Sequence, residues 1–448
     1  MNNTEMKRRS FLQLMAGAGL ATSMPALTLG SASAGATEVT PYDGDFYISI
    51  DAEGGWDVTS FCDPKQNTNI NHWADSGSIQ NISGSPIQYA PFAHNSRFFN
   101  AHHSDMLVIN GVDAQTNAHQ AGRRYNWSGR LAEGYPSFAA LAAAVYGKDL
   151  PLAYLSNGGY NQTADLVSYT LMQDPSALNK LVYPDRFVDY DPAQDDLAKY
   201  YHRKNTRDLI ASYQQQRLAR LQGAAQNNTL APRLRNAIQQ FASAKQGESL
   251  LSRLEAHIPE TLVGFTDADG EWNPLLRQAQ IAIAAYKSGL CVSCDLVSWG
   301  FDTHADHDTE QGRAMQRLQN GIEYLWAEAE RQGVADKLKV LVSSDFGRTP
   351  TYNEGDGKDH WPIGSAIFMA KNANWANRVV GQTTADHEAQ SLNPQTLQLD
   401  ASDNGVKIQP KHIQYAMRKL AGIENHEICQ RFPLDAEDFD FFNPALNI

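Results

Sequence analysis

Short apolar runs, each bounded by polar clusters, recur along this 448-residue chain. Runs of this kind are typical of buried strands. They cover residues 46–51, 106–110, 151–155, 291–299, 339–342 and 366–370. Helical spacing of apolar residues lies between them, in 138–146 after the capping residue Ser137, in 274–285 and in 309–332. The alternation predicts an α/β fold in which helices cover both faces of a mostly parallel sheet.

Two regions depart from this alternation. Residues 195–257 are rich in Arg, Gln, Leu and Ala, with apolar residues at spacings of three and four, which predicts a polar helical insertion. Near the C-terminus, residues 411–421 predict a short helix. We therefore expect one α/β domain over residues 45–448, with a helical insertion at about 195–257.

The N-terminus carries the pattern of an export signal. The sequence KRRSFL at residues 7–12 precedes a weakly apolar stretch that ends in ASA at 32–34. These features indicate a twin-arginine signal peptide over residues 1–34, followed by a linker at 35–44; a basic amphipathic helix is the alternative. The twin-arginine export machinery is thus an expected partner, and the mature protein is expected in the periplasm or outside the cell.

Net charge and hydropathy argue against two other kinds of partner, nucleic acid and the membrane. The formal net charge is −13, and removal of residues 1–34, which contain three basic and one acidic residue, changes it to −15. This negative charge argues against nucleic acid as a partner. No later run of 18 apolar residues follows the signal, so we expect no stable membrane insertion after cleavage.

Carboxylate and imidazole side chains flank three of the predicted strands. Asp302 and His304 follow 291–299, Asp345 follows 339–342, and His360 precedes 366–370. Residues i and i+2 of an extended segment point to one side, so Asp302 and His304 share a direction. Open α/β sheets bind ligands at the carboxyl ends of their strands, and these side chains suit a divalent transition metal. The sequence predicts that these four side chains converge on one metal ion.

Three phrases carry a family resemblance: GFDTH at 300–304, SSDFGRTP at 343–350 and GKDHWP at 357–362. From about residue 47 onward the chain resembles the DUF1501 family of exported bacterial proteins, whose members are similar to the alkaline phosphatase/sulfatase superfamily. The resemblance implies this fold, a first metal held by Asp302, His304 and His360, and Asp345 as ligand of a second. Phe346 stands where the superfamily has a metal-binding histidine. We therefore expect one site rather than two, for a divalent metal such as zinc or manganese.

A glycine pair before Asp57 adds a fifth candidate ligand. The sequence EGGWD at 53–57 follows the first predicted strand, and two glycines allow the backbone to approach a ligand closely. The resemblance implies a metal-bridging aspartate in this region. We favour Asp57 over Asp51, which ends the strand, while a plain turn with a solvated Asp57 is the alternative.

Several residues are candidates for contacting a substrate. The resemblance implies a nucleophile after the second strand, and Thr116 is the only hydroxyl residue there; its alternative is a turn or helix cap. His119, Arg123 and Lys358 are candidates for holding an anionic group, although a solvated loop face is the alternative for the first two. Arg348 is a candidate for neutralising charge that develops during catalysis.

Two functions from different classes follow. The first is a metal-dependent hydrolase of phosphate or sulfate esters, acting on an anionic small molecule or glycan. The second is a non-catalytic envelope scaffold or binding protein that retains the phosphatase-like fold. Phe346 favours the second function, whereas the convergence of ligand-type residues at several strand ends favours the first.

Overall fold

The computed structural model describes residues 40–172, 203–226, 252–259 and 261–446, and the chain divides into two units. Residues 40–173 and 263–448 form an α/β unit that includes every candidate site residue. The other unit comprises residues 1–39 and 174–262. The predicted signal peptide lies outside the described residues.

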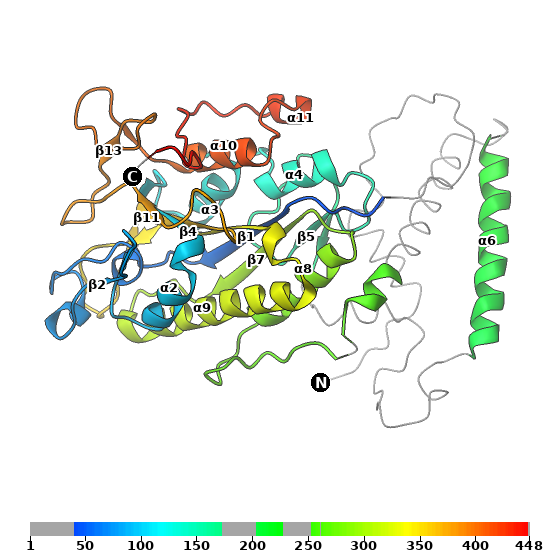
Figure 1. Cartoon of the computed structure of the whole chain (residues 1–448), viewed down its shortest axis with the longest axis horizontal. Coiled ribbons are helices and arrows are strands. Elements are labelled where there is room, and N and C mark those ends of the chain that lie inside the picture. The colour runs from blue at the N-terminus through cyan, green and yellow to red at the C-terminus, as the bar shows by residue number, and fades with distance from the viewer. Residues whose placement is uncertain (1–39, 173–202, 227–251, 260, 447–448) are drawn as a thin grey trace. The chain divides into compact units, whose positions relative to one another are not determined.

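The main sheet of the described chain has eight strands in the order β12-β4-β11-β8-β1-β7-β5-β6 (Figure 1). Neighbours pair in parallel except β11, which is antiparallel to both β4 and β8. The chain from β8 to β11 passes through a small hairpin and not through a crossover helix, which a parallel neighbour would need. The strands are β1 (Phe46–Glu53), β4 (Met106–Asp113), β5 (Tyr154–Ser156), β6 (Tyr169–Leu171), β7 (Ser293–Trp299), β8 (Leu338–Ser344), β11 (Ile363–Met369) and β12 (Arg378–Val380).

Helices cover both faces of this sheet, so the predicted α/β fold is confirmed. Figure 1 shows α2 (Asn95–His102) and α9 (His307–Gln332) on one side, and α3 (His119–Ser128), α4 (Phe138–Tyr146) and α10 (Pro410–Leu420) on the other. Helix α8 (Leu275–Lys287) packs against α9. Short elements complete this unit: β2 (Gln80–Asn81) with β3 (Gln88–Tyr89), β9 (Gly347–Arg348) with β10 (His360–Trp361), β13 (Ser391–Leu392) with β14 (Val406–Lys407), α11 (Glu427–Gln430), and the 3-10 turns η2 (Val58–Ser60), η3 (His72–Asp75), η4 (His103–Asp105) and η7 (Ala335–Lys337).

Three parallel strands at the centre of the sheet end at the same edge. Ala52 of β1 lies opposite Ser344 of β8, and Glu53 lies opposite Trp299 of β7. The strands themselves are buried, and each fully buried Val, Leu or Ile contributes about 1.5–3 kcal/mol, so this register is strongly fixed. The segments that follow the three strands are thereby brought together.

The predicted insertion is described in part. Helix α6 (Lys204–Gln226) lies within it, as does the 3-10 turn η6 (Ser252–Ala256), whereas residues 195–202 and 227–251 lie outside the described residues. Among the described helices, none is both long enough and apolar enough to cross a membrane.

Candidate metal centre

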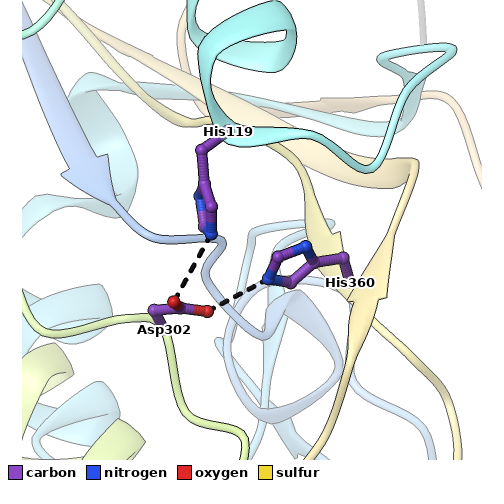
Figure 2. Close-up of side chains that lie close together, drawn as sticks. All are labelled: His119, Asp302 and His360. Carbon is purple, nitrogen blue, oxygen red and sulfur yellow. Dashed lines mark hydrogen bonds and ion pairs between the residues drawn. The ribbon is translucent and has the colours of Figure 1, made fainter.

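His119, Asp302 and His360 point toward one another at the carboxyl edge of the sheet (Figure 2). His119 begins α3, Asp302 follows β7 and His360 begins β10. Asp302 Oδ2 lies 3.4 Å from His119 Nε2, and Asp302 Oδ1 lies 3.1 Å from His360 Nε2. One ligand atom of each residue lies within 4.8 Å of those of the other two. Three distant segments thus place their ligand atoms around one point.

His304 adds a second imidazole next to His360. Its Nε2 lies 3.0 Å from Asp302 Oδ1 and 2.9 Å from His360 Nε2. Two imidazole nitrogens this close must share either a proton or a cation, because two lone pairs or two N–H groups would repel each other. On its other side, His304 Nδ1 lies 2.7 Å from Asp359 Oδ1. His304 thus extends the group of imidazoles around Asp302.

The chemistry of these side chains fits a divalent transition metal. Imidazole and carboxylate are ligands of zinc and manganese, and all four side chains are partly exposed, so an ion has access from solvent. Burial acts to raise the pKa of Asp302, but a 2.7 Å hydrogen bond from Arg348 Nη2, a hydrogen bond from His360 and the positive charge of Arg348 together outweigh it and lower this pKa to about 2. Asp302 is thus ionised at neutral pH, as a metal ligand must be.

Arg348 fixes Asp302 and the glycine pair relative to each other. Its fully buried guanidinium donates to the carbonyls of Gly54, Gly55 and Lys358 as well as to Asp302. A side chain at Gly54 could not be accommodated, because its Cβ would lie 2.5 Å from the backbone nitrogen of Asp302. The structure therefore gives Arg348 a positioning contact with the cluster.

Asp345 contacts the cluster through His119. Its fully buried carboxylate accepts a 2.7 Å hydrogen bond at Oδ2 from His119 Nδ1. This bond raises the pKa of His119 above its usual 6.5 and fixes the proton on Nδ1, which leaves Nε2 to face Asp302. Asp345 is thus placed to orient a ligand.

Asp345→Asn is therefore expected to weaken metal affinity by about 10–100-fold, the usual effect of losing a carboxylate that orients a metal-binding histidine. Affinity can be measured by competition with a chelator, with thermal unfolding as a check that the variant is folded. Glu133→Gln makes the corresponding change on an exposed carboxylate that pairs with Arg124, and should leave affinity unchanged. Equal affinities for Asp345→Asn and wild type would contradict the orienting role.

Asp57 and Lys358 lie in a separate buried network. Asp57 Oδ2 lies 2.6 Å from Lys358 Nζ and 3.0 Å from His307 Nε2, and all three side chains are fully buried. Asp57 Oδ1 accepts hydrogen bonds from the backbone and the hydroxyl of Thr59, which lies in the turn η2. Asp57 is thus neither solvated nor part of the metal-binding group, and Lys358 has no exposed surface with which to contact a substrate.

Thr116 and Arg123 also have internal partners. Thr116 Oγ1 accepts a 3.2 Å hydrogen bond from the backbone nitrogen of Ala118, which is the turn geometry expected before a helix. Arg123 lies 3.2 Å from Asp51 and 2.7 Å from Glu53, and its Nε lies 3.5 Å from Asp345 Oδ1. Its guanidinium therefore neutralises the charge of carboxylates next to the metal-binding residues and is not free to bind a substrate.

Phe346 forms one wall of the centre. It is buried, and its ring centroid lies 4.9 Å from that of His119 and 4.5 Å from that of His360. A phenyl ring offers no ligand atom and excludes water from that side of both imidazoles. This geometry accords with one metal ion at the cluster.

The model of a family described as "Protein of unknown function (DUF1501)" matches residues 47–398. The chain belongs to this family. The resemblance carried by the three sequence phrases is thus confirmed. No curated protein matches this DUF1501 chain.

Solved structures similar to this DUF1501 protein include sulfatases and an alkaline phosphatase. A Bacteroides thetaiotaomicron protein of glycosaminoglycan metabolism is 9% identical over 91% of this chain and 78% of its own, with a TM-score of 0.41. Alkaline phosphatase from the Antarctic bacterium TAB5 is 8% identical over 86% and 99%, with a TM-score of 0.36. A 2-O GAG sulfatase is 10% identical over 86% and 72%, with a TM-score of 0.31.

Sequence reasoning missed two features of this DUF1501 centre. It assigned His119 to substrate, whereas the structure groups His119 with Asp302 and His360. It also passed over His307, three residues after His304, which contacts Asp57. The signal for His119 was its position, since it follows a predicted strand just as Asp302 and Asp345 do.

Proposed function

We propose that this DUF1501 protein is a hydrolase of phosphate or sulfate esters that uses one divalent metal ion, zinc or manganese, held by His119, Asp302 and His360. The observation that carries the proposal is the convergence of their ligand atoms within 4.8 Å of one another, from segments far apart in the sequence. Two imidazoles and a carboxylate leave a coordination position open, which is the arrangement of catalytic rather than structural zinc sites.

A divalent metal ion bound there supplies positive charge that polarises an ester oxygen and lowers the pKa of a water molecule. The chain's own residues prepare the site: Arg348 keeps Asp302 ionised, and Asp345 keeps the His119 proton on Nδ1. His304 is exposed, and its Nδ1 contacts Asp359. We assign it the transfer of a proton to or from the reacting ester, because an imidazole can both donate and accept a proton and a carboxylate fixes the orientation of this one.

The basic side chains near the centre already have partners inside the protein, which limits what can bind an anionic substrate. Arg348 and Lys358 are fully buried and paired, and Arg123 is engaged by three carboxylates. The anionic group of the substrate, a small molecule or a glycan, would therefore be held by the metal ion itself. Export through the twin-arginine machinery to the periplasm or beyond remains part of the proposal, resting on the sequence of residues 1–34.

A non-catalytic scaffold is the second candidate, favoured by one observation. His304 Nε2 lies 2.9 Å from His360 Nε2, close enough for His304 to act as a fourth protein ligand. Four protein ligands make a closed, structural metal site. The two functions thus differ in the role of His304.

One experiment separates them. Protein exported by its native route is expected to contain about one metal ion per chain by elemental analysis and to hydrolyse an aryl phosphate or an aryl sulfate. His304→Ala is expected to keep the ion but lose about 100-fold in rate. Loss of the ion in His304→Ala, together with an inactive wild type, would establish the scaffold. A metal-free but stably folded wild type would overturn the hydrolase, and two ions per chain would contradict the single site.

A further inference from the structure

A cavity lies at the C-terminal end of β7. It has a volume of about 190 Å³ and is lined by Trp272, Trp299 and Arg317, among others. Trp299 ends β7, and Arg317 lies on α9. Asn273 also lines the cavity, but its amide is buried and hydrogen-bonded to Asp267, Leu275 and the Arg317 carbonyl. The cavity thus combines aromatic faces with a cation.

The two tryptophans are far more exposed than their size predicts. Trp272 is 64% exposed and Trp299 is 40% exposed. Large aromatic side chains bury most of their surface in folded proteins, and exposed aromatic groups at a concave site mark recognition of a ligand. Two exposed indoles on one cavity therefore point to a ligand with a flat apolar face.

Arg317 gives the cavity a positive charge. Its Nη2 donates a 3.2 Å hydrogen bond to the carbonyl of Trp299, and no carboxylate of the described residues forms an ion pair with it. Gly300 permits this approach, because a Cβ there would lie 2.5 Å from Arg317 Nη2. An arginine without a carboxylate partner favours a ligand with an anionic group. The net charge of −13 on the whole chain disfavours a nucleic acid as that ligand.

The cavity lies within reach of the metal centre. Asp302 is three positions after Trp299, and three residues of extended chain span at most about 11 Å. A chain-like substrate whose ester group lies at Asp302 could therefore place a neighbouring unit in the cavity. The volume is below the roughly 300–1,000 Å³ of pockets for drug-sized ligands, so the cavity would hold a single ring.

We propose that the cavity binds one pyranose ring of an anionic glycan, and that it positions the adjacent sugar at the metal centre; the second part rests on the proposed function. The C–H face of a pyranose carries partial positive charge and packs on the negative face of an indole. A sulfate or carboxylate on the ring suits Arg317. This narrows the substrate class to an anionic oligosaccharide.

Isothermal titration calorimetry on the full protein tests the binding without turnover. The probes are hexasaccharides of chondroitin sulfate, heparin, carrageenan and polygalacturonate, each with its uncharged counterpart where one can be prepared. At least one charged hexasaccharide is expected to bind the wild type. Trp272→Ala and Trp299→Ala should each raise its Kd at least tenfold, and Arg317→Gln should raise the Kd of the charged form only.

Tyr213→Ala is the matched control, since Tyr213 is 61% exposed on α6, outside the cavity, and its loss should leave Kd unchanged. Metal content of the Trp272→Ala variant should equal that of the wild type. The inference is overturned if no hexasaccharide binds, or if Tyr213→Ala weakens binding as much as Trp272→Ala. Because binding is read without hydrolysis, an inactive protein that binds glycan would refute the hydrolase proposal and leave this one standing.

Discussion

Replacing Asp302 by alanine is expected to remove the bound metal ion and to lower kcat/KM for ester hydrolysis by about 10³-fold, equivalent to about 4 kcal/mol of transition-state stabilisation. The reason is geometric: the Asp302 carboxylate lies 3.4 Å or less from His119, His304 and His360. No other carboxylate in the described chain joins two of these imidazoles in a metal-binding group. Elemental analysis and steady-state kinetics with aryl esters measure both effects.

Asp438→Ala is a matched control for Asp302→Ala. The Asp438 side chain is 48% exposed, as is that of Asp302, but its partner is Lys419 in the C-terminal part of the chain. Metal content and rate should not change in this variant. Full metal occupancy in Asp302→Ala would show that the cluster does not hold the ion.

Lys358→Met is expected to lower the free energy of unfolding by about 3–5 kcal/mol, because it leaves the buried Asp57 carboxylate without its 2.6 Å partner. Removal of one member of a buried ion pair costs the desolvation energy of the charge that remains. Lys358 also lies two residues before His360, so its loss should weaken metal binding as well. Chemical denaturation measures the change in stability.

Two comparisons test the origin of that loss. Lys419→Met breaks an exposed pair with Asp438 and should cost only about 0–1 kcal/mol. The double variant Asp57→Asn, Lys358→Met removes both charges and should recover part of the stability, since no unpaired charge then stays buried. A double variant less stable than Lys358→Met would contradict the ion-pair explanation.

The Asp57–Lys358 ion pair also makes the stability of the fold depend on pH. Burial acts to raise the pKa of Asp57, but Lys358 and His307 outweigh it and hold this pKa well below 3.8. A carboxyl group whose pKa is lower in the folded state stabilises the fold above its unfolded pKa, and this contribution is lost as the pH falls. Stability of the wild type should therefore decrease below about pH 4, and the double variant should lack this component.

The sequence by itself determined much of the secondary structure and the edge of the sheet at which the candidate metal-binding residues lie. The predicted helix 138–146 has the bounds of α4, and Ser137 caps it by accepting a hydrogen bond from the Ala140 nitrogen. Such features are local, since apolar periodicity and capping depend on residues within a few positions. From their places at strand ends, the sequence also predicted that Asp302, His304, Asp345 and His360 would lie close together. In the structure Asp302 contacts His304 and His360, whereas Asp345 reaches this group through His119.

Only the tertiary structure decided which polar residues face each other. His119 and Asp345 are 226 positions apart, and Asp57 and Lys358 are 301 apart, yet each pair is in contact. In the sequence all four are simply polar residues near predicted strands. Nothing there shows that His119 and Asp345 form a ligand and the residue that orients it, or that Asp57 and Lys358 form a buried ion pair. Their partners depend on how the segments after β1, β4, β8 and β9 pack, with Phe346 and the glycine pair setting the available space. That packing is a property of the assembled sheet, and local sequence patterns do not encode it.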